Sequence, residues 1–170
     1  DQAASLRSYQ SSLSRMEAKR AITCVAVASG KGGVGKTLVS VNLGIAFAKL
    51  KRKVLIVDAD LGLANADICL GVNPEFTLQD AIFRGKPFNE VVTKTPYGVD
   101  LLAASSGSAE MVSMGAARMG LVIQDLLSFA AAYDVLIFDC ASGIDSGVTS
   151  FLKAAPMNLI VANPSPTSIM

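Results

Sequence analysis

The stretch Gly30-Lys31-Gly32-Gly33-Val34-Gly35-Lys36-Thr37 decides the fold class of this chain. It satisfies the pattern GxxxxGK[ST], in which the backbone N–H groups of a glycine-rich loop surround phosphate oxygens. A short apolar run, residues 22–28, precedes it, and helical periodicity resumes over residues 37–50, so the stretch joins a predicted strand to a predicted helix. The sequence therefore predicts a phosphate-binding loop whose cofactor contacts come from Gly30, Lys31, Gly32, Gly33, Val34, Gly35, Lys36, Thr37 and Leu38.

The residue types in this loop fit a magnesium-bound triphosphate such as ATP with Mg²⁺. Lys36 places a positive charge against the β and γ phosphates, and Thr37 offers a hydroxyl to Mg²⁺. A carboxylate at the end of a neighbouring strand should hold the metal from its other side, and Asp139, after the apolar run 135–138, fits that role. The alternative, a glycine-rich turn without a ligand, leaves Lys36 and Thr37 unexplained.

Two further carboxylates, Asp58 and Asp60, follow the apolar run 54–57. Ligands bind at the carboxyl edge of open α/β sheets, so both residues are candidates for orienting the attacking water and metal-bound waters. We expect Asp58 among the metal-binding residues and Asp60 among the catalytic ones. Helix capping or simple solvation of a loop is the alternative explanation for this pair, and the sequence leaves it open.

Strands alternate with helices along the chain. This order predicts an α/β fold with a three-layer, doubly wound and mostly parallel sheet. Residues 1–20 form a separate N-terminal helix and residues 21–170 the nucleotide-binding domain. The predicted strands are 22–28, 54–57, 99–103, 135–138 and 158–162, and the predicted helices are 3–20, 37–50, 78–83, 114–132 and 148–155.

The composition excludes several classes of protein. Hydrophobic residues make up 51% of the chain and charged residues 17%, which argues against disorder. No apolar run is long enough to span a membrane and no secretion signal is evident, so we expect a cytoplasmic protein. Three scattered cysteines, Cys24, Cys69 and Cys140, predict buried, inert thiols. A net charge of +1 makes DNA an improbable partner.

The lysine directly after the first glycine resembles the deviant Walker A motif of the MinD/ParA family. The resemblance covers residues 22–168 and implies a SIMIBI-type P-loop ATPase. It implies that Lys31 crosses an ATP-sandwiched homodimer to the partner's phosphates and acts in catalysis with Lys36 and Asp60. The segment 58–67, which includes Asn65, resembles the family's switch I, and 139–143 resembles switch II. Leu38 stands where the family commonly has a second threonine.

The first seven residues, DQAASLR, resemble the DQAxxLR motif of the FlhG family (also FleN or YlxH), whose members regulate flagellar number and placement. The resemblance implies that Asp1, Gln2, Leu6 and Arg7 contact an FlhF-type GTPase and activate it. The apolar side chains at helical spacing, Leu6, Tyr9, Leu13 and Met16, would anchor such a helix in a partner's groove. Packing of the same face on its own domain is the alternative.

The family resemblance also implies further partners and locations. Flagellar C-ring proteins or a flagellar transcription regulator are candidate partners. The family's adenine-contacting segment and its C-terminal amphipathic membrane helix would lie beyond Met170, so attachment at the inner membrane or cell pole would need that helix. Two alternatives remain. One is a MinD/ParA-type ATPase for chromosome, plasmid or division-site positioning, and the other is a nucleotide-binding regulatory scaffold that does not hydrolyse ATP.

Overall fold

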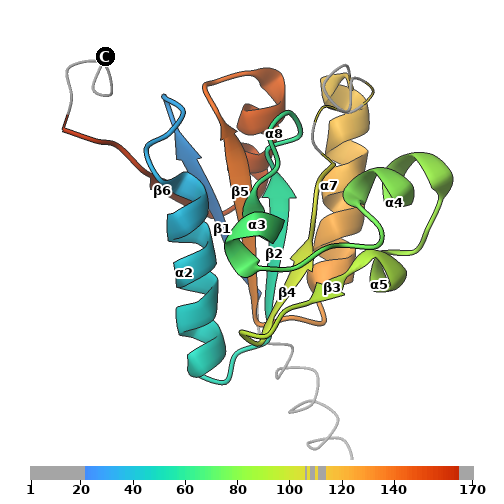
Figure 1. The fold of residues 1–170 in the computed structure, drawn as a ribbon. Coiled ribbons are helices and arrows are strands. Elements are labelled where there is room, and N and C mark those ends of the chain that lie inside the picture. The colour runs from blue at the N-terminus through green and yellow to red at the C-terminus, as the bar shows by residue number, and fades with distance from the viewer. Residues whose placement is uncertain (1–21, 106, 108–109, 111–113, 165–170) are drawn as a thin grey trace, which may run out of the picture.

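The structure is a computed structural model that describes residues 22–105, 107, 110 and 114–164. Six strands form one sheet in the order β3-β4-β2-β5-β1-β6 (Figure 1). Neighbouring strands are parallel except β3, which pairs antiparallel with β4 at one edge. The predicted mostly parallel α/β sheet is therefore confirmed. The strands are β1 Thr23–Ser29, β2 Val54–Ala59, β3 Thr93–Lys94, β4 Val99–Leu102, β5 Val135–Ser142 and β6 Met157–Ile160.

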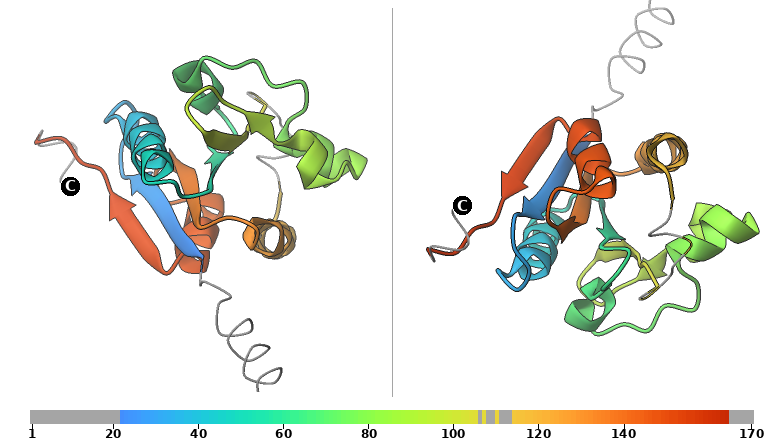
Figure 2. Two further views of the ribbon diagram at one scale, coloured as in Figure 1. Left: turned by 90° about the horizontal axis from the view of Figure 1, so that it is seen from below. Right: turned by 90° about the horizontal axis from the view of Figure 1, so that it is seen from above.

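Helices cover both faces of the sheet, which gives the three predicted layers (Figure 2). Helices α2 and α3 pack on one face, α7 and α8 pack on the other, and α4 and α5 extend beside α7. The predicted helix over residues 3–20 lies outside the described residues. The helices of the described part are α2 Lys36–Lys49, α3 Ala66–Leu70, α4 Leu78–Arg84, α5 Phe88–Val91, α7 Ala116–Ala130 and α8 Ser146–Ala154.

The central strands are apolar throughout because both of their faces are buried. In β1, Cys24 and Ala26 point into the cluster that contains α7 and α8, whereas Val25 and Val27 point into the cluster that contains α2 and α3. Helix α2 approaches the sheet closely at Gly44, where an added Cβ would lie 2.8 Å from Ile56 Cδ1. The absence of a side chain at this position sets how closely the helix after the phosphate loop packs on β2.

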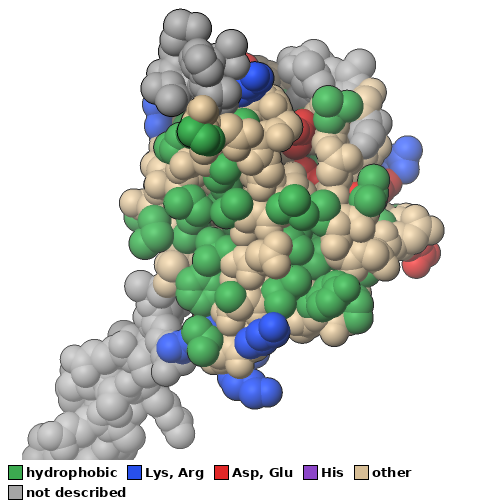
Figure 3. Space-filling model, turned by 60° about the vertical axis from the view of Figure 1, so that its left-hand side comes forward, with side chains coloured by type: hydrophobic (Ala, Val, Ile, Leu, Met, Phe, Trp, Pro, Cys, Tyr) green, Lys and Arg blue, Asp and Glu red, His purple; other side chains and the backbone are tan. Residues whose placement is uncertain are grey.

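The edge strand β6 is exposed, unlike the central strands. Met157, Leu159 and Ile160 are exposed by 56%, 39% and 61%. Figure 3 shows hydrophobic side chains gathered on this side of the molecule. The described residues contain no helix long and apolar enough to cross a membrane.

The prediction of three buried thiols is correct for Cys24 and Cys140 and wrong for Cys69, which is exposed. Cys69 belongs to the short helix α3, which buries only Ala66 and Leu70 against the sheet. A single turn of helix at the surface has one inward face, and Cys69 lies off that face.

Candidate functional site

The loop between β1 and α2 has the backbone of a phosphate cradle. Gly33 and Gly35 adopt φ of 75° and 96°, a region that side chains other than glycine rarely occupy. At Gly30, Gly33 and Gly35 no described atom lies within 4 Å of the place where a Cβ would stand. Gly35 also precedes α2, so the N–H groups of the first helical turn and the positive end of the helix dipole face this open space.

Hydrogen bonds tie the loop to the two central strands. The Ser29 hydroxyl donates to the Lys31 carbonyl at 2.7 Å. The Gly143 N–H, just after β5, donates to the Ser29 carbonyl at 2.9 Å. The predicted switch II segment therefore holds the start of the phosphate loop directly.

Asp139 lies beneath the start of α2 and connects to the predicted magnesium ligand Thr37. The Thr37 side chain hydrogen-bonds the Asp139 carboxylate, and the Ser40 hydroxyl donates to Asp139 Oδ1 at 2.8 Å. Burial raises the pKa of Asp139, while these hydrogen bonds and the charge of Lys36 oppose the rise. Lys36 and Asp139 are only 8% and 1% exposed. The structure thus brings Asp139 close to Lys36 and Thr37, which lie in a distant part of the sequence.

Asp58 stands beside Asp139 on the neighbouring strand, in register with it. Its Oδ2 accepts from the N–H groups of Asn65 at 3.0 Å and Ala66 at 3.1 Å, and its Oδ1 accepts from Asp60 N–H at 3.1 Å. Burial raises the pKa of Asp58 to about 7, with the nearby Asp139 adding to the rise and these amides opposing it. This geometry favours the capping alternative for Asp58, because the carboxylate closes the loop after β2. Its metal role stays a prediction.

Asp60 lies in that loop, at the carboxyl edge and more exposed than Asp58. Its Oδ1 accepts from Leu63 N–H at 3.0 Å, and its charge adds to the rise in the pKa of Asp139. Asp60 is therefore close enough to Asp139 for the two charges to interact, and its catalytic role stays a prediction. Lys31 is exposed on the phosphate loop, and Leu38 is 58% exposed.

The oxygen atoms of the site fit a magnesium ion that binds a few protein groups together with the phosphates of a nucleotide. No group of three or more His, Cys, Asp or Glu side chains that could hold a metal occurs among the described residues. Mg²⁺ in nucleotide sites usually takes one or two protein oxygens together with phosphates and waters, which Thr37 and Asp139 can supply. Sequence reasoning missed Ser40, although it stands one helical turn after Lys36, on the same face of α2.

The fold and this loop define a P-loop nucleotide-binding domain. Residues 22–170 match the sequence model of a family described as an AAA domain. The chain is 42% identical to the antiactivator FleN of Pseudomonas aeruginosa over 157 residues, which are 92% of this chain and 56% of FleN. The chain belongs to the MinD/ParA family of P-loop ATPases and lies close to the FlhG proteins.

Other relatives point the same way. The flagellum site-determining protein YlxH of Helicobacter pylori is 31% identical, over 85% of this chain and 49% of YlxH. The septum site-determining protein MinD of Pyrococcus horikoshii, solved with Mg-ADP, superposes with a TM-score of 0.77 at 28% identity, over 88% of this chain and 61% of that chain. The chain spans about half the length of the curated relatives that it matches.

Proposed function

We propose that this protein is a Mg²⁺-dependent ATPase that cycles between a monomer and an ATP-bound homodimer and regulates flagellar number and placement. The proposed ATPase activity rests on one observation. The open glycine loop ends at the buried Lys36, beside the hydrogen-bonded pair Thr37 and Asp139. The identity to FleN and to YlxH supports the flagellar role.

The residues of the site would divide the work between binding and hydrolysis. The loop amides and Lys36 would hold the phosphates, and the Thr37 hydroxyl and the Asp139 carboxylate would hold Mg²⁺, which would supply positive charge against the phosphates. Asp60 orients the attacking water and accepts a hydrogen bond from it through a carboxylate oxygen. Lys31, exposed on the loop, contacts the phosphates of the partner subunit. Phosphoryl transfer needs mostly positioning and charge stabilisation, and these residues supply both.

The partners follow from the family and from the N-terminal motif. We propose that Asp1, Gln2, Leu6 and Arg7 activate an FlhF-type GTPase, and that C-ring proteins or a flagellar transcription regulator recognise the dimer. The motif lies outside the described residues. Mixing a peptide of residues 1–20 with an FlhF-type GTPase and measuring GTP turnover tests it, and an unchanged rate would remove this part of the proposal.

Two variants test the ATPase. Lys36→Ala should lower affinity for Mg-ATP on the order of a hundredfold, because a buried charge pairing is lost. Lys49→Ala, at the exposed end of the same helix, is the matched control and should bind normally. Asp60→Ala should keep binding, lose phosphate release and accumulate as a dimer, measured by light scattering.

The same measurements separate the alternatives. Mg-ATP binding by the unaltered protein without any phosphate release would favour the regulatory scaffold over the ATPase. ATP-dependent binding to non-specific DNA that weakens with salt would favour a chromosome-partition role. Phosphate release at an unchanged rate in Asp60→Ala would overturn the role of Asp60.

A further inference from the structure

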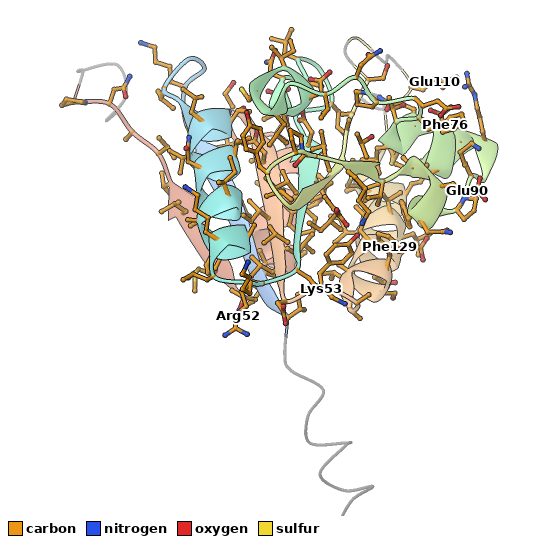
Figure 4. The ribbon with its side chains drawn as sticks, turned by 60° about the horizontal axis from the view of Figure 1, so that its bottom comes forward. Arg52, Lys53, Phe76, Glu90, Glu110 and Phe129 are labelled. Carbon is orange, nitrogen blue, oxygen red and sulfur yellow. The ribbon has the colours of Figure 1, made fainter. Side chains whose placement is uncertain are left out.

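A trough runs along the outer side of α7, away from the nucleotide site. It consists of two adjoining cavities that share Asn89 and Phe129. The upper cavity, about 600 Å³, lies between α7 and the α4–α5 segment. The lower cavity, about 430 Å³, continues past the end of α7 to Lys53 and Tyr133. Figure 4 views the molecule from this lower side, with Phe129 and Lys53 labelled.

Aromatic and aliphatic side chains line the trough together with charged ones, which include Asp125 in the upper cavity and Lys94 and Asp100 in the lower one. Phe129 stands 5.5 Å from the ring of Phe88 and 6.0 Å from the ring of Tyr133, measured between centroids. Val122 is buried at its base, and Leu121 is 63% exposed at its rim. A large exposed leucine beside a concave aromatic surface is typical of a site that buries another apolar element.

The two cations of the upper cavity lie over aromatic rings. Lys86 Nζ stands 3.8 Å from the ring centroid of Phe76, and Arg118 Cζ stands 4.8 Å from that of Phe83. Both charges are therefore engaged within the domain.

The N-terminal segment joins the domain at the lower end of this trough. Thr23 N–H donates to the carbonyl of Asp134 at 2.9 Å, and Lys53 N–H donates to the carboxylate of the same residue at 2.9 Å. Lys53 lines the lower cavity. Asp134 therefore connects the start of β1, which follows residue 22, to the wall of the trough. A segment that precedes residue 22 can reach the trough without crossing the molecule.

The lengths also match. The apolar positions of the predicted helix, from Leu6 to Met16, span about 15 Å at 1.5 Å per residue. The part of α7 that lines the upper cavity, from Arg118 to Phe129, spans about 16 Å by the same rise. Five residues, 17–21, bridge Met16 and the start of the domain, which is up to roughly 17 Å when extended.

We propose that the part of the N-terminal segment from residue 3 to Met16 docks intramolecularly in this trough through the face formed by Leu6, Tyr9, Leu13 and Met16. A short tether holds the segment at an effective concentration on the order of millimolar, so a weak contact suffices. The same face cannot be buried against the domain and against a partner at once. Docking would therefore keep the proposed partner-binding motif inaccessible until a partner competes with the trough for it. Only this consequence rests on the proposed function.

A single-tryptophan variant tests the docking, because the chain contains no tryptophan. In Tyr9→Trp, without nucleotide or partner, the introduced indole should show blue-shifted emission and resist acrylamide quenching. Adding Leu121→Asp at the trough should shift the emission to the red and raise the quenching constant about threefold or more, because a charge is placed in the apolar contact. The matched control is Ile160→Asp, on the β6 face, where the exposure of 61% is close to the 63% of Leu121.

Each outcome decides the question. Exposure of the indole by Leu121→Asp alone supports the trough. An indole that is already exposed in Tyr9→Trp, or that only Ile160→Asp exposes, overturns the proposal. Protection that grows with protein concentration also overturns it, because the segment then reaches a second copy. Since no ATP is present, failure here leaves the proposed ATPase untouched.

Discussion

Replacing Gly44 by alanine should destabilise the protein, although alanine is the better helix former. Alanine in a helix interior gains about 1 kcal/mol over glycine. In α2 the new Cβ would lie 2.8 Å from Ile56 Cδ1 and 3.3 Å from Ile56 Cγ1, and Ile56 is fully buried in the sheet. Forcing an extra methyl group into a packed core costs about 1–3 kcal/mol. We expect a net loss of about 1 kcal/mol, or roughly 2–4 °C in Tm.

A matched control isolates the steric cost. Gly120 lies inside α7, and no described atom stands within 4 Å of its Cβ position. Gly120→Ala should therefore stabilise the protein by about 0.5–1 kcal/mol, the opposite sign for the same chemical change. Urea denaturation followed by circular dichroism measures both variants.

The double variant with Ile56→Val locates the clash. Ile56→Val alone should cost about 1 kcal/mol, but it removes the methyl group that Gly44→Ala meets. The two changes together should cost about 1 kcal/mol less than their sum. The reasoning is refuted if Gly44→Ala stabilises as much as Gly120→Ala, or if the double variant is additive.

Two further predictions concern ionisable groups. Burial raises the pKa of Asp58 to about 7, so between pH 4 and pH 7 the folded protein binds more protons than the unfolded one. Without Mg²⁺ and nucleotide, the free energy of unfolding should therefore fall over this range, by ~4 kcal/mol at most, and urea titrations showing a rise would contradict this. Burial also raises the pKa of Cys24 to about 11 and of Cys140 to about 12. The pKa of Cys69 is raised as well, but Cys69 is exposed, so an aromatic disulfide reagent at pH 8 should label only Cys69 in the native protein and all three thiols after unfolding, checked by peptide mass spectrometry.

Local sequence patterns predicted the central elements well. The glycine loop between an apolar run and a periodic segment placed β1 and α2 within one or two residues, because these signals depend on neighbouring positions. The predicted strand 54–57 ended too early, since β2 continues through Asp58 and Ala59. The burial of the two adjacent carboxylates could not be predicted, because Asp58 needs the amides of the loop that follows it to fold back, and the hydroxyl of Ser40 that bonds Asp139 is 99 positions away.

The elements that were missed are held by tertiary contacts. The two-residue strand β3 exists because Thr93 and Lys94 pair with β4, and no two-residue pattern announces a strand. Helices α3 and α5 have five and four residues, too few to show helical periodicity. The spacing of Ser40 places it on the same face of α2 as Lys36, but its hydrogen bond to Asp139 joins residues 99 positions apart and was missed.

The pairing of β1 has a consequence for synthesis on the ribosome. Both neighbours of this strand, β5 and β6, are translated roughly a hundred residues after it, about 5–20 s later at ordinary elongation rates. Until then β1 has no sheet to join, and Gly143 is not yet made to hold Ser29. The start of the phosphate loop therefore lacks this support in the nascent chain until β5 and Gly143 have been synthesised.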